Sequence, residues 1–163
     1  MVLCPATNKP DADLVYTPDH YAVAIVEYYK PQGRILEPCR GGGAFTRAMP
    51  TAEWCELQEG KDFLKHEGQY DWLITNPPWS KIKHFLDHAV KLQIPNIVLL
   101  VNFNALTTKA RLRSIYQAGY SIKELLCLPT PKAFPQMGFQ LAAVHIVKQP
   151  NQQIKVTFKD LPL

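Results

Sequence analysis

Apolar residues recur along the chain with two different spacings, and each spacing predicts a type of secondary structure. Apolar positions three and four residues apart place Ile82, Phe85 and Leu86 on one face of a helix. Residues 97–101 are continuously apolar and mostly β-branched, which is typical of a strand covered on both faces. By the same criteria we expect further helices at 18–29 and around 112–116, a short helix after residue 43 that Pro50 ends, and strands at 34–37, 52–56, 72–75, 122–128 and 141–147.

Residues that start or stop helices sharpen these boundaries. Thr17 followed by Pro18 is typical of an N-cap with proline at the first helical position. Ser80 is expected to cap the strongly amphipathic helix that carries Phe85. Gly119 is expected to end the helix around 112–116.

Strands that alternate with helices predict an α/β sandwich with a mainly parallel sheet. The strands at 122–128 and 141–147 are joined by a proline-rich loop without a helical pattern, so we expect that pair to be antiparallel. In such a sheet a ligand binds outside the carboxyl ends of the strands.

The composition is that of one globular domain spanning 1–163, with 47% hydrophobic and 20% charged residues. No apolar run approaches the roughly 20 residues that span a bilayer, so we expect no membrane association. Residues 1–5 lack the basic segment of a signal peptide. Cys4, Cys39, Cys55 and Cys127 contain no Cys-x-x-Cys pair, so we expect reduced thiols in the cytoplasm, without disulfides or a metal.

Positive charge is concentrated in one stretch of the chain. The net charge is +4, yet residues 81–113 alone contain six basic residues and one acid. A polyanionic partner would explain this asymmetry, and a solvated helix face would explain it equally well. The basic residues are Lys81, Lys83, Lys91, Lys109, Arg111 and Arg113.

The most informative motif is Asn76-Pro77-Pro78-Trp79, which directly follows the strand predicted at 72–75. Two prolines fix φ at successive residues and restrict the residue before them, so the strand ends in a rigid turn. The Asn76 amide and the Pro77 carbonyl are then held beside an aromatic ring. Such a corner suits a planar amine, for example the exocyclic nitrogen of a base. An ordinary proline-rich turn is the alternative.

A glycine-rich segment, Gly41-Gly42-Gly43, follows the first predicted strand. Glycines there permit positive φ and let a ligand approach the backbone closely. The segment lacks a full G-x-G-x-x-G and a following Lys-Ser/Thr, which argues against nicotinamide and P-loop nucleotide sites.

Acidic residues stand at the ends of successive predicted strands. Glu56 is placed to accept the two hydroxyls of a ribose, and Asp62 to accept an adenine amine, with Phe63 stacking on the base. Glu37 is placed to pair with a cationic group of the ligand. Taken singly, acids such as these are more often solvent-facing, and it is their joint placement at successive strand ends that favours a ligand site.

In this order the motifs resemble those of amino-methylating methyltransferases that use S-adenosyl-L-methionine. The chain is most similar to adenine-specific (N6) DNA methyltransferases of the NPPW type, especially the small enzymes of phages and prophages, and the resemblance covers residues 17–148. It implies the class I methyltransferase fold, a Rossmann-like three-layer sandwich with an antiparallel last strand. It also implies a cytoplasmic enzyme, acting in the host cytoplasm if a phage encodes it.

The resemblance assigns the cofactor site. In this family Thr17 and Glu37 would hold the methionine end, and Glu56 the ribose. Arg40 stands where a small residue is common, and the short segment after Gly43 leaves Glu59 as an alternative to Glu56. The expected cofactor-binding residues are Tyr16, Thr17, Pro18, Glu37, Pro38, Gly41, Gly43, Glu56, Asp62, Phe63 and Asn76, with simple packing as the alternative for Tyr16.

The resemblance also assigns the acceptor site. Asn76, Pro77, Pro78 and Trp79 would form the catalytic corner, in which two oxygens accept hydrogen bonds from the N6 amine of adenine. Trp79 is the first expected stacking platform, and Phe139 or Phe134 the second, unless those two rings fill the core. Lys109 and Arg111 are expected to contact DNA.

Two alternatives stay open. The acceptor could be an RNA base or a protein glutamine amide, since NPP motifs occur in both groups. The chain could also be a non-catalytic subunit that binds cofactor or nucleic acid beside an active partner. No segment is left for a target-recognition domain, so a partner could supply specificity.

Overall fold

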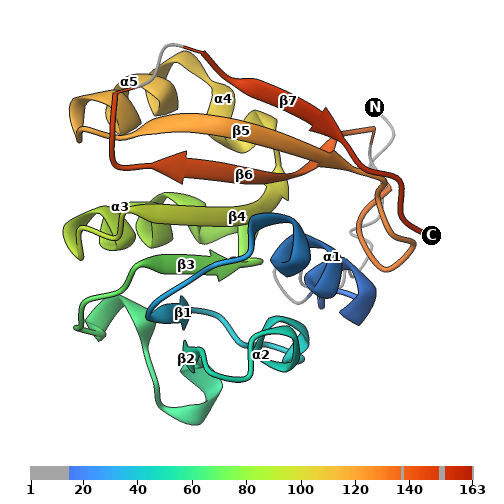
Figure 1. The fold of residues 1–163 in the computed structure, drawn as a ribbon, viewed down its shortest axis with the longest axis horizontal. Helices are drawn as coiled ribbons and strands as arrows, with labels where there is room; N and C mark the ends of the chain where they lie inside the picture. Colours follow the sequence, from blue (N-terminus) through green and yellow to red (C-terminus); the bar gives the residue numbers. More distant parts are fainter. Residues whose placement is uncertain (1–14, 137, 151–152, 163) are drawn as a thin grey trace, which may run out of the picture.

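The computed structural model describes residues 15–136, 138–150 and 153–162, which build a single seven-stranded sheet flanked by helices (Figure 1). The strand order is β2-β1-β3-β4-β6-β5-β7. The strands are β1 (Ile35–Glu37), β2 (Glu53–Trp54), β3 (Trp72–Thr75), β4 (Asn96–Asn102), β5 (Ser121–Leu128), β6 (Leu141–Val147) and β7 (Lys155–Phe158). The helices are α1 (Asp19–Tyr29), α2 (Ala44–Ala48), α3 (Ile82–Lys91), α4 (Asn104–Thr107) and α5 (Lys109–Gln117), with three short 3-10 turns, η1 (Leu57–Glu59), η2 (Phe63–Lys65) and η3 (Trp79–Lys81).

The sheet is parallel except at β6, which confirms the predicted fold class. The pairs β1–β2, β1–β3, β3–β4 and β5–β7 are parallel, whereas β6 is antiparallel to both β4 and β5. A parallel return needs a crossover connection, usually a helix. The segment between β5 and β6 contains no helix in its described part, so the chain returns antiparallel.

Helices cover both faces of the sheet, and the alternation of side chains along β4 shows how. Ile97, Leu99 and Val101 pack into one core with α3 and α5. Val98 and Leu100 point to the opposite face and pack into a second core with α1 and α2. Successive residues of a strand face opposite sides, so a strand between two helical layers must be apolar throughout.

The topology brings three loops together at one edge of the sheet. Strands β1, β2 and β3 are parallel neighbours, so their carboxyl ends lie side by side. The segments that follow them are 38–43, 55–62 and 76–81. These segments carry the predicted glycine loop, the acidic residues and the Asn-Pro-Pro-Trp turn.

Two predicted helix starts differ from the structure. Pro18, not Thr17, occupies the N-cap of α1, and its carbonyl accepts hydrogen bonds from Tyr21 and Ala22. Ser80 lies inside the 3-10 turn η3, and α3 begins at Ile82 with Lys81 at its N-cap. The prolines at 77 and 78 tighten the chain after β3, which delays the first regular helical turn.

Apart from the three 3-10 turns, two elements were not predicted. Helix α4 is a single turn directly after β4, and β7 is a four-residue edge strand. Strand β7 has no apolar alternation that faces a core, because Val156 and Phe158 are exposed. Its pairing with β5 is decided by tertiary contacts, which the local pattern does not encode.

Within the described part of the chain, none of the helices has both the length and the apolar character that crossing a bilayer requires. The expectations for Cys4 and for residues 1–5 concern positions outside the described residues.

Candidate active site

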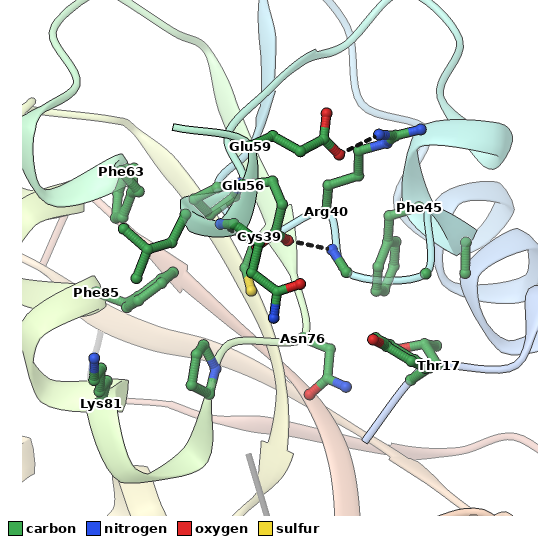
Figure 2. A pocket seen from close by; sticks show the side chains of 18 of the residues that line it. Thr17, Cys39, Arg40, Phe45, Glu56, Glu59, Phe63, Asn76, Lys81 and Phe85 are labelled. Carbon is green, nitrogen blue, oxygen red and sulfur yellow. Dashed lines mark hydrogen bonds and ion pairs between the residues drawn. The ribbon is translucent and has the colours of Figure 1, made fainter. Parts of the chain in front are cut away.

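A cavity of about 310 Å³ opens at the carboxyl ends of β1, β2 and β3, where the three loops meet (Figure 2). This volume lies at the lower end of the range of small-molecule sites. Figure 2 shows Phe63 and Phe85 on one side of the cavity and Thr17 on the other, with Asn76 between them. The predicted site residues that line it are Tyr16, Thr17, Pro38, Gly41, Glu56, Asp62, Phe63, Asn76 and Pro78.

The glycine loop requires glycine at two positions because of its backbone conformation. Gly41 and Gly43 have φ values of +48° and +81°, in the left-handed region that other residues rarely adopt. The Tyr16 ring lies over the loop, and a β-carbon at Gly41 would stand 3.3 Å from it. Gly43 also provides the N-cap of α2. The loop is therefore a tight turn covered by an aromatic side chain.

Glu56 ties the glycine loop to the turn after β2. Its Oε2 accepts a hydrogen bond from the Gly41 backbone N–H at 2.8 Å, and its Oε1 accepts one from the Gln58 N–H at 3.2 Å. A carboxylate has about four acceptor positions, so both oxygens can still accept further hydrogen bonds. Glu56 thus shapes the cavity wall and keeps capacity for ligand hydroxyls.

Arg40 lines the cavity and forms an ion pair with Glu59. The Nη1–Oε1 distance is 2.7 Å, and both side chains are partly exposed. The Arg40 guanidinium also lies 4.6 Å from the centre of the Trp54 ring. These contacts explain how an arginine is accommodated in this loop, and they occupy one Glu59 oxygen.

Asp62 and Phe63 lie on the opposite wall. Asp62 caps η2 by accepting a hydrogen bond from the Leu64 N–H at 3.0 Å. Phe63 is only 3% exposed and packs against Phe85, with ring centres 5.1 Å apart. The wall is therefore an apolar, aromatic surface with one carboxylate at its rim. Phe85 lines the cavity but was not predicted as a site residue, because on the sequence it is one more apolar position of an amphipathic helix.

Glu37 is fully buried at the end of β1 and only half paired. Thr75 Oγ1 donates a hydrogen bond to its Oε1 at 2.6 Å, while its Oε2 has no hydrogen-bond partner. Burial raises the pKa of Glu37 to about 8, although hydrogen bonds from Thr75 and the Cys39 backbone lower it in part. Glu37 does not itself line the cavity, but the next two residues, Pro38 and Cys39, do.

Asn76 is held in one orientation at the edge of the cavity. Its Nδ2 donates a hydrogen bond to the Val15 carbonyl at 3.0 Å, and its Oδ1 is buried without a partner. The amide nitrogen must face the carbonyl, so the oxygen must face the other way. The contribution of Val15 could not be predicted, because a backbone carbonyl is not identified by its residue type.

Trp79, Phe134 and Phe139 form one aromatic cluster beside this turn. The Trp79 ring makes edge-to-face contacts with Phe139 at 5.1 Å and with Phe134 at 6.0 Å between ring centres. Phe134 is 3% exposed and belongs to the core on the α1 face, as the alternative reading of that residue expected. Trp79 and Phe139 are half-buried, so they keep exposed ring surface.

Several predicted residues lie outside the cavity lining. Pro18, Gly43, Pro77 and Trp79 are close to it in sequence but do not line it. Lys109 and Arg111 lie on α5, which follows β4 and α4, and they do not line the cavity either. Lys81 is the member of the basic stretch that does.

In the described residues, four buried side-chain polar atoms have no hydrogen-bond partner, and two of them belong to this region: Glu37 Oε2 and Asn76 Oδ1. Buried acceptors without partners are rare because they carry a free-energy cost. Asn76 lines the cavity, and Glu37 directly precedes two residues that line it, so both oxygens without partners lie at or beside this cavity.

No protein-family model matches the sequence, and no curated protein matches it significantly. Solved structures do match the fold. A candidate class I S-adenosylmethionine-dependent methyltransferase from Listeria monocytogenes has a TM-score of 0.64 at 12% identity, over 94% of this chain and 68% of that chain.

Two further structures match. A candidate RNA methyltransferase from Pyrococcus horikoshii has a TM-score of 0.63 at 14% identity, over 90% of this chain and 91% of that chain. A modification subunit of a candidate type I restriction enzyme from Vibrio vulnificus has a TM-score of 0.57 at 14% identity, over 91% of this chain and 47% of that chain. At these identities the likeness concerns the fold alone. The chain therefore has the Rossmann-like fold of class I methyltransferases.

Proposed function

We propose that this chain is an S-adenosylmethionine-dependent methyltransferase that methylates an exocyclic amine, namely N6 of adenine in DNA. The observation that carries the proposal is the Asn76 amide. Its nitrogen is held by the Val15 carbonyl, and its buried oxygen has no partner at the edge of the cavity. Leaving a buried acceptor unpaired costs free energy, and an amine N–H of a substrate would remove that cost.

Groups in the cavity and beside it could accept the hydrogen bonds that the cofactor donates and pack against its base. Glu37 offers one unpaired carboxylate oxygen for a cationic amine, and Glu56 can accept ribose hydroxyls. Phe63 and Phe85 supply an apolar surface for a flat base, with Asp62 at its rim as an acceptor. These groups fit the methionine, ribose and adenine parts of S-adenosylmethionine in the order expected from the motifs.

Bound S-adenosylmethionine supplies a methyl group on a sulfonium, which needs only an in-line nucleophile. The residues of this chain position that nucleophile. Hydrogen bonds from the amine to Asn76 Oδ1 and to the Pro77 carbonyl would favour a tetrahedral nitrogen with its lone pair available. The same two oxygens stabilise the positive charge that develops on the nitrogen, so they bind the transition state more tightly than the ground state.

Adenine in DNA is the acceptor that the surroundings favour. Trp79 and Phe139 offer half-buried aromatic surface next to Asn76, which suits a base that has left the helical stack. Lys81 at the cavity and the basic residues Lys109 and Arg111 supply charge for phosphates. The Vibrio vulnificus structure, described as a modification subunit, agrees with DNA as the acceptor.

An RNA base is the second candidate acceptor. The Pyrococcus horikoshii structure, described as an RNA methyltransferase candidate, has a similar fold over nearly the whole of both chains. The same corner of Asn76 and Pro77 would serve an exocyclic amine in either nucleic acid. A partner protein could direct the choice of target in both cases.

The test is transfer of a radiolabelled methyl group from S-adenosylmethionine to unmethylated DNA, to RNA and to protein. We expect label on N6 of adenine in DNA. Asn76→Ala should lower the rate by about a hundredfold or more, the usual effect of removing one positioned hydrogen-bonding group. Asn76→Asp keeps an acceptor and should retain more activity than Asn76→Ala.

Asn96→Ala is the matched control. Asn96 lies at the amino end of β4, and its side chain makes two hydrogen bonds, to the Asp71 carbonyl and to His145. Its loss should leave transfer activity intact at temperatures where the variant is folded. Equal activity of Asn76→Ala and wild type would refute the proposed role. Cofactor binding without transfer to any acceptor would instead support a non-catalytic subunit.

A further inference from the structure

Thr75 joins the two halves of the proposed site, although its position on the sequence is only that of the last residue of a buried strand. It is fully buried, directly precedes Asn76, and donates a hydrogen bond to Glu37 Oε1 at 2.6 Å. That distance is in the range of a hydroxyl bonded to a carboxylate, which is among the stronger hydrogen bonds in proteins.

The effect of this bond is to make the two Glu37 oxygens different. Oε1 is occupied by the Thr75 hydroxyl, whereas Oε2 is buried and has no partner. A freely rotating carboxyl could present either oxygen to a ligand, and it would lose that rotational freedom on binding. The hydroxyl removes that freedom in advance, which lowers the cost of binding.

We propose that Thr75 is a positioning residue that holds Glu37 so that Oε2 receives the ammonium group of the bound cofactor. This inference rests on the proposed function, because it takes the cofactor to carry an α-ammonium group. The role goes beyond the assignment of Glu37 itself. It gives Thr75, the residue directly before Asn76, a part in cofactor recognition.

Two hydrogen-bond donors hold the Glu37 carboxyl, the Thr75 hydroxyl and the Cys39 backbone amide, and of these only the hydroxyl belongs to a side chain that a substitution can remove. In the described part of the chain, the groups that act on its charge are the Thr75 hydroxyl, the Cys39 backbone amide and the Glu56 carboxylate. Glu56 has the same charge and disfavours ionisation, and the buried Cys55 thiol at the end of β2 also faces Glu37. None of these groups is a cation, so a ligand ammonium would be the first positive charge beside this carboxyl.

The arrangement links cofactor binding to pH. Burial keeps the pKa of Glu37 near 8 in the ligand-free protein, so much of it is protonated at pH 7. An ammonium group binds the ionised form, so the proton must leave to solvent when the ligand binds. Affinity for the ammonium should therefore rise as the pH increases from 6 to 8.

The experiment compares two ligands by calorimetry with the full chain. S-adenosylhomocysteine carries the α-ammonium, and 5′-methylthioadenosine lacks the whole amino-acid end. Thr75→Val removes the hydroxyl and keeps the side-chain shape. We expect it to weaken S-adenosylhomocysteine binding by about tenfold or more at pH 7. Binding of 5′-methylthioadenosine should change less than about twofold, since that ligand makes no use of Glu37.

Two further variants separate positioning from folding. Thr75→Ser keeps the hydroxyl and should restore both the affinity and its pH dependence. In a Glu37→Gln background, Thr75→Val should have little additional effect, because the two residues act as one unit. Equal weakening of both ligands by Thr75→Val, or unchanged binding of S-adenosylhomocysteine, would overturn the inference while leaving the proposed methyl transfer intact. Failure of the wild-type chain to bind S-adenosylhomocysteine would overturn both.

Discussion

Glu37 and Glu124 are both buried in this molecule, and their surroundings differ in an instructive way. Glu37, at the end of β1, has one oxygen bonded to Thr75 and the other without a partner. Glu124, within β5, accepts hydrogen bonds from Tyr28 at 2.6 Å and Thr157 at 2.7 Å, and it pairs with Lys155 at 3.1 Å. Glu37 thus has one buried oxygen without a partner, whereas three groups, one of them a cation, converge on Oε1 of Glu124.

The pKa values follow from this difference. Burial raises the pKa of Glu37 to about 8, and its hydrogen bonds offset only part of that rise. Burial also acts to raise the pKa of Glu124, but the hydrogen bonds from Tyr28, Thr157 and Lys155 outweigh it and hold the pKa below its ordinary value. Glu124 links α1 to β5 and β7 through one oxygen. Glu37 keeps a buried oxygen without a partner, and its raised pKa is the kind of shift that agrees with the proposed role in ligand binding.

The largest effect on folding is expected for Glu37→Gln. The folded carboxyl keeps a proton that the unfolded one loses above its ordinary pKa of 4.5. Its contribution to stability is therefore fully present below pH 4.5 and is lost as the pH rises toward 8. Gln carries no charge, so the variant should be more stable than wild type by on the order of 3 kcal/mol at pH 8. Urea denaturation at pH 4.5 and 8 measures this, and an equal difference at both pH values would contradict it.

The same substitution at the other glutamate should have the opposite sign. Glu124→Gln loses a charge that three groups stabilise, so we expect it to destabilise the protein by about 1–2 kcal/mol at pH 7. Lys155 is 66% exposed, and its ion pair should add little to that loss. Because the folded pKa of Glu124 is lowered, its contribution is present above pH 4.5 and is lost as the pH falls further.

Denaturation of Glu124→Gln at pH 7 and at pH 3 checks both parts of that prediction. The difference from wild type should shrink at the lower pH, since the wild-type carboxyl then begins to protonate. If Glu124→Gln were more stable than wild type at pH 7, the hydrogen bonds to Glu124 would not outweigh the cost of burying its charge. The two glutamates would then not differ in this way.

The smallest effect is expected at the rim of the cavity. Arg40 and Glu59 form an ion pair, but their side chains are 37% and 46% exposed. Arg40→Ala should therefore destabilise the protein by less than about 1 kcal/mol, and less still in high salt. Thermal denaturation in low and high salt measures this. A salt-independent loss of several times that size would show that stacking on Trp54 matters more than the charge.

The acidic and glycine positions of the site were accessible from the sequence because parallel strands end at a common edge. Glu56 and Asp62 follow β2 and Asn76 follows β3, and the structure brings all three to one cavity. The contacts that each side chain makes were harder to predict from the sequence. Glu56 and Glu59 both line the cavity, but Glu59 pairs with Arg40, whereas Glu56 accepts a hydrogen bond from the glycine loop.

Residues distant in sequence set the details that the motifs could not reveal. The Val15 carbonyl orients Asn76 across a sequence separation of 61 residues, and Thr75 orients Glu37 across 38. The aromatic residues after β5 show the same limit. Phe134 and Phe139 have similar sequence contexts, but the first is buried in the core and the second keeps exposed ring surface beside Trp79.

By itself the sequence determined the alternation of helices and strands, the parallel sheet with its antiparallel β6, and the loops that meet at one edge. These follow from hydrophobic spacing and from the rule that strands of one direction end together, which local composition is enough to express. Only the tertiary structure decided which buried oxygens are left without partners. Pairing depends on where distant segments meet, and here Val15 and Thr75 engage one atom of Asn76 and of Glu37 and leave the other atom open.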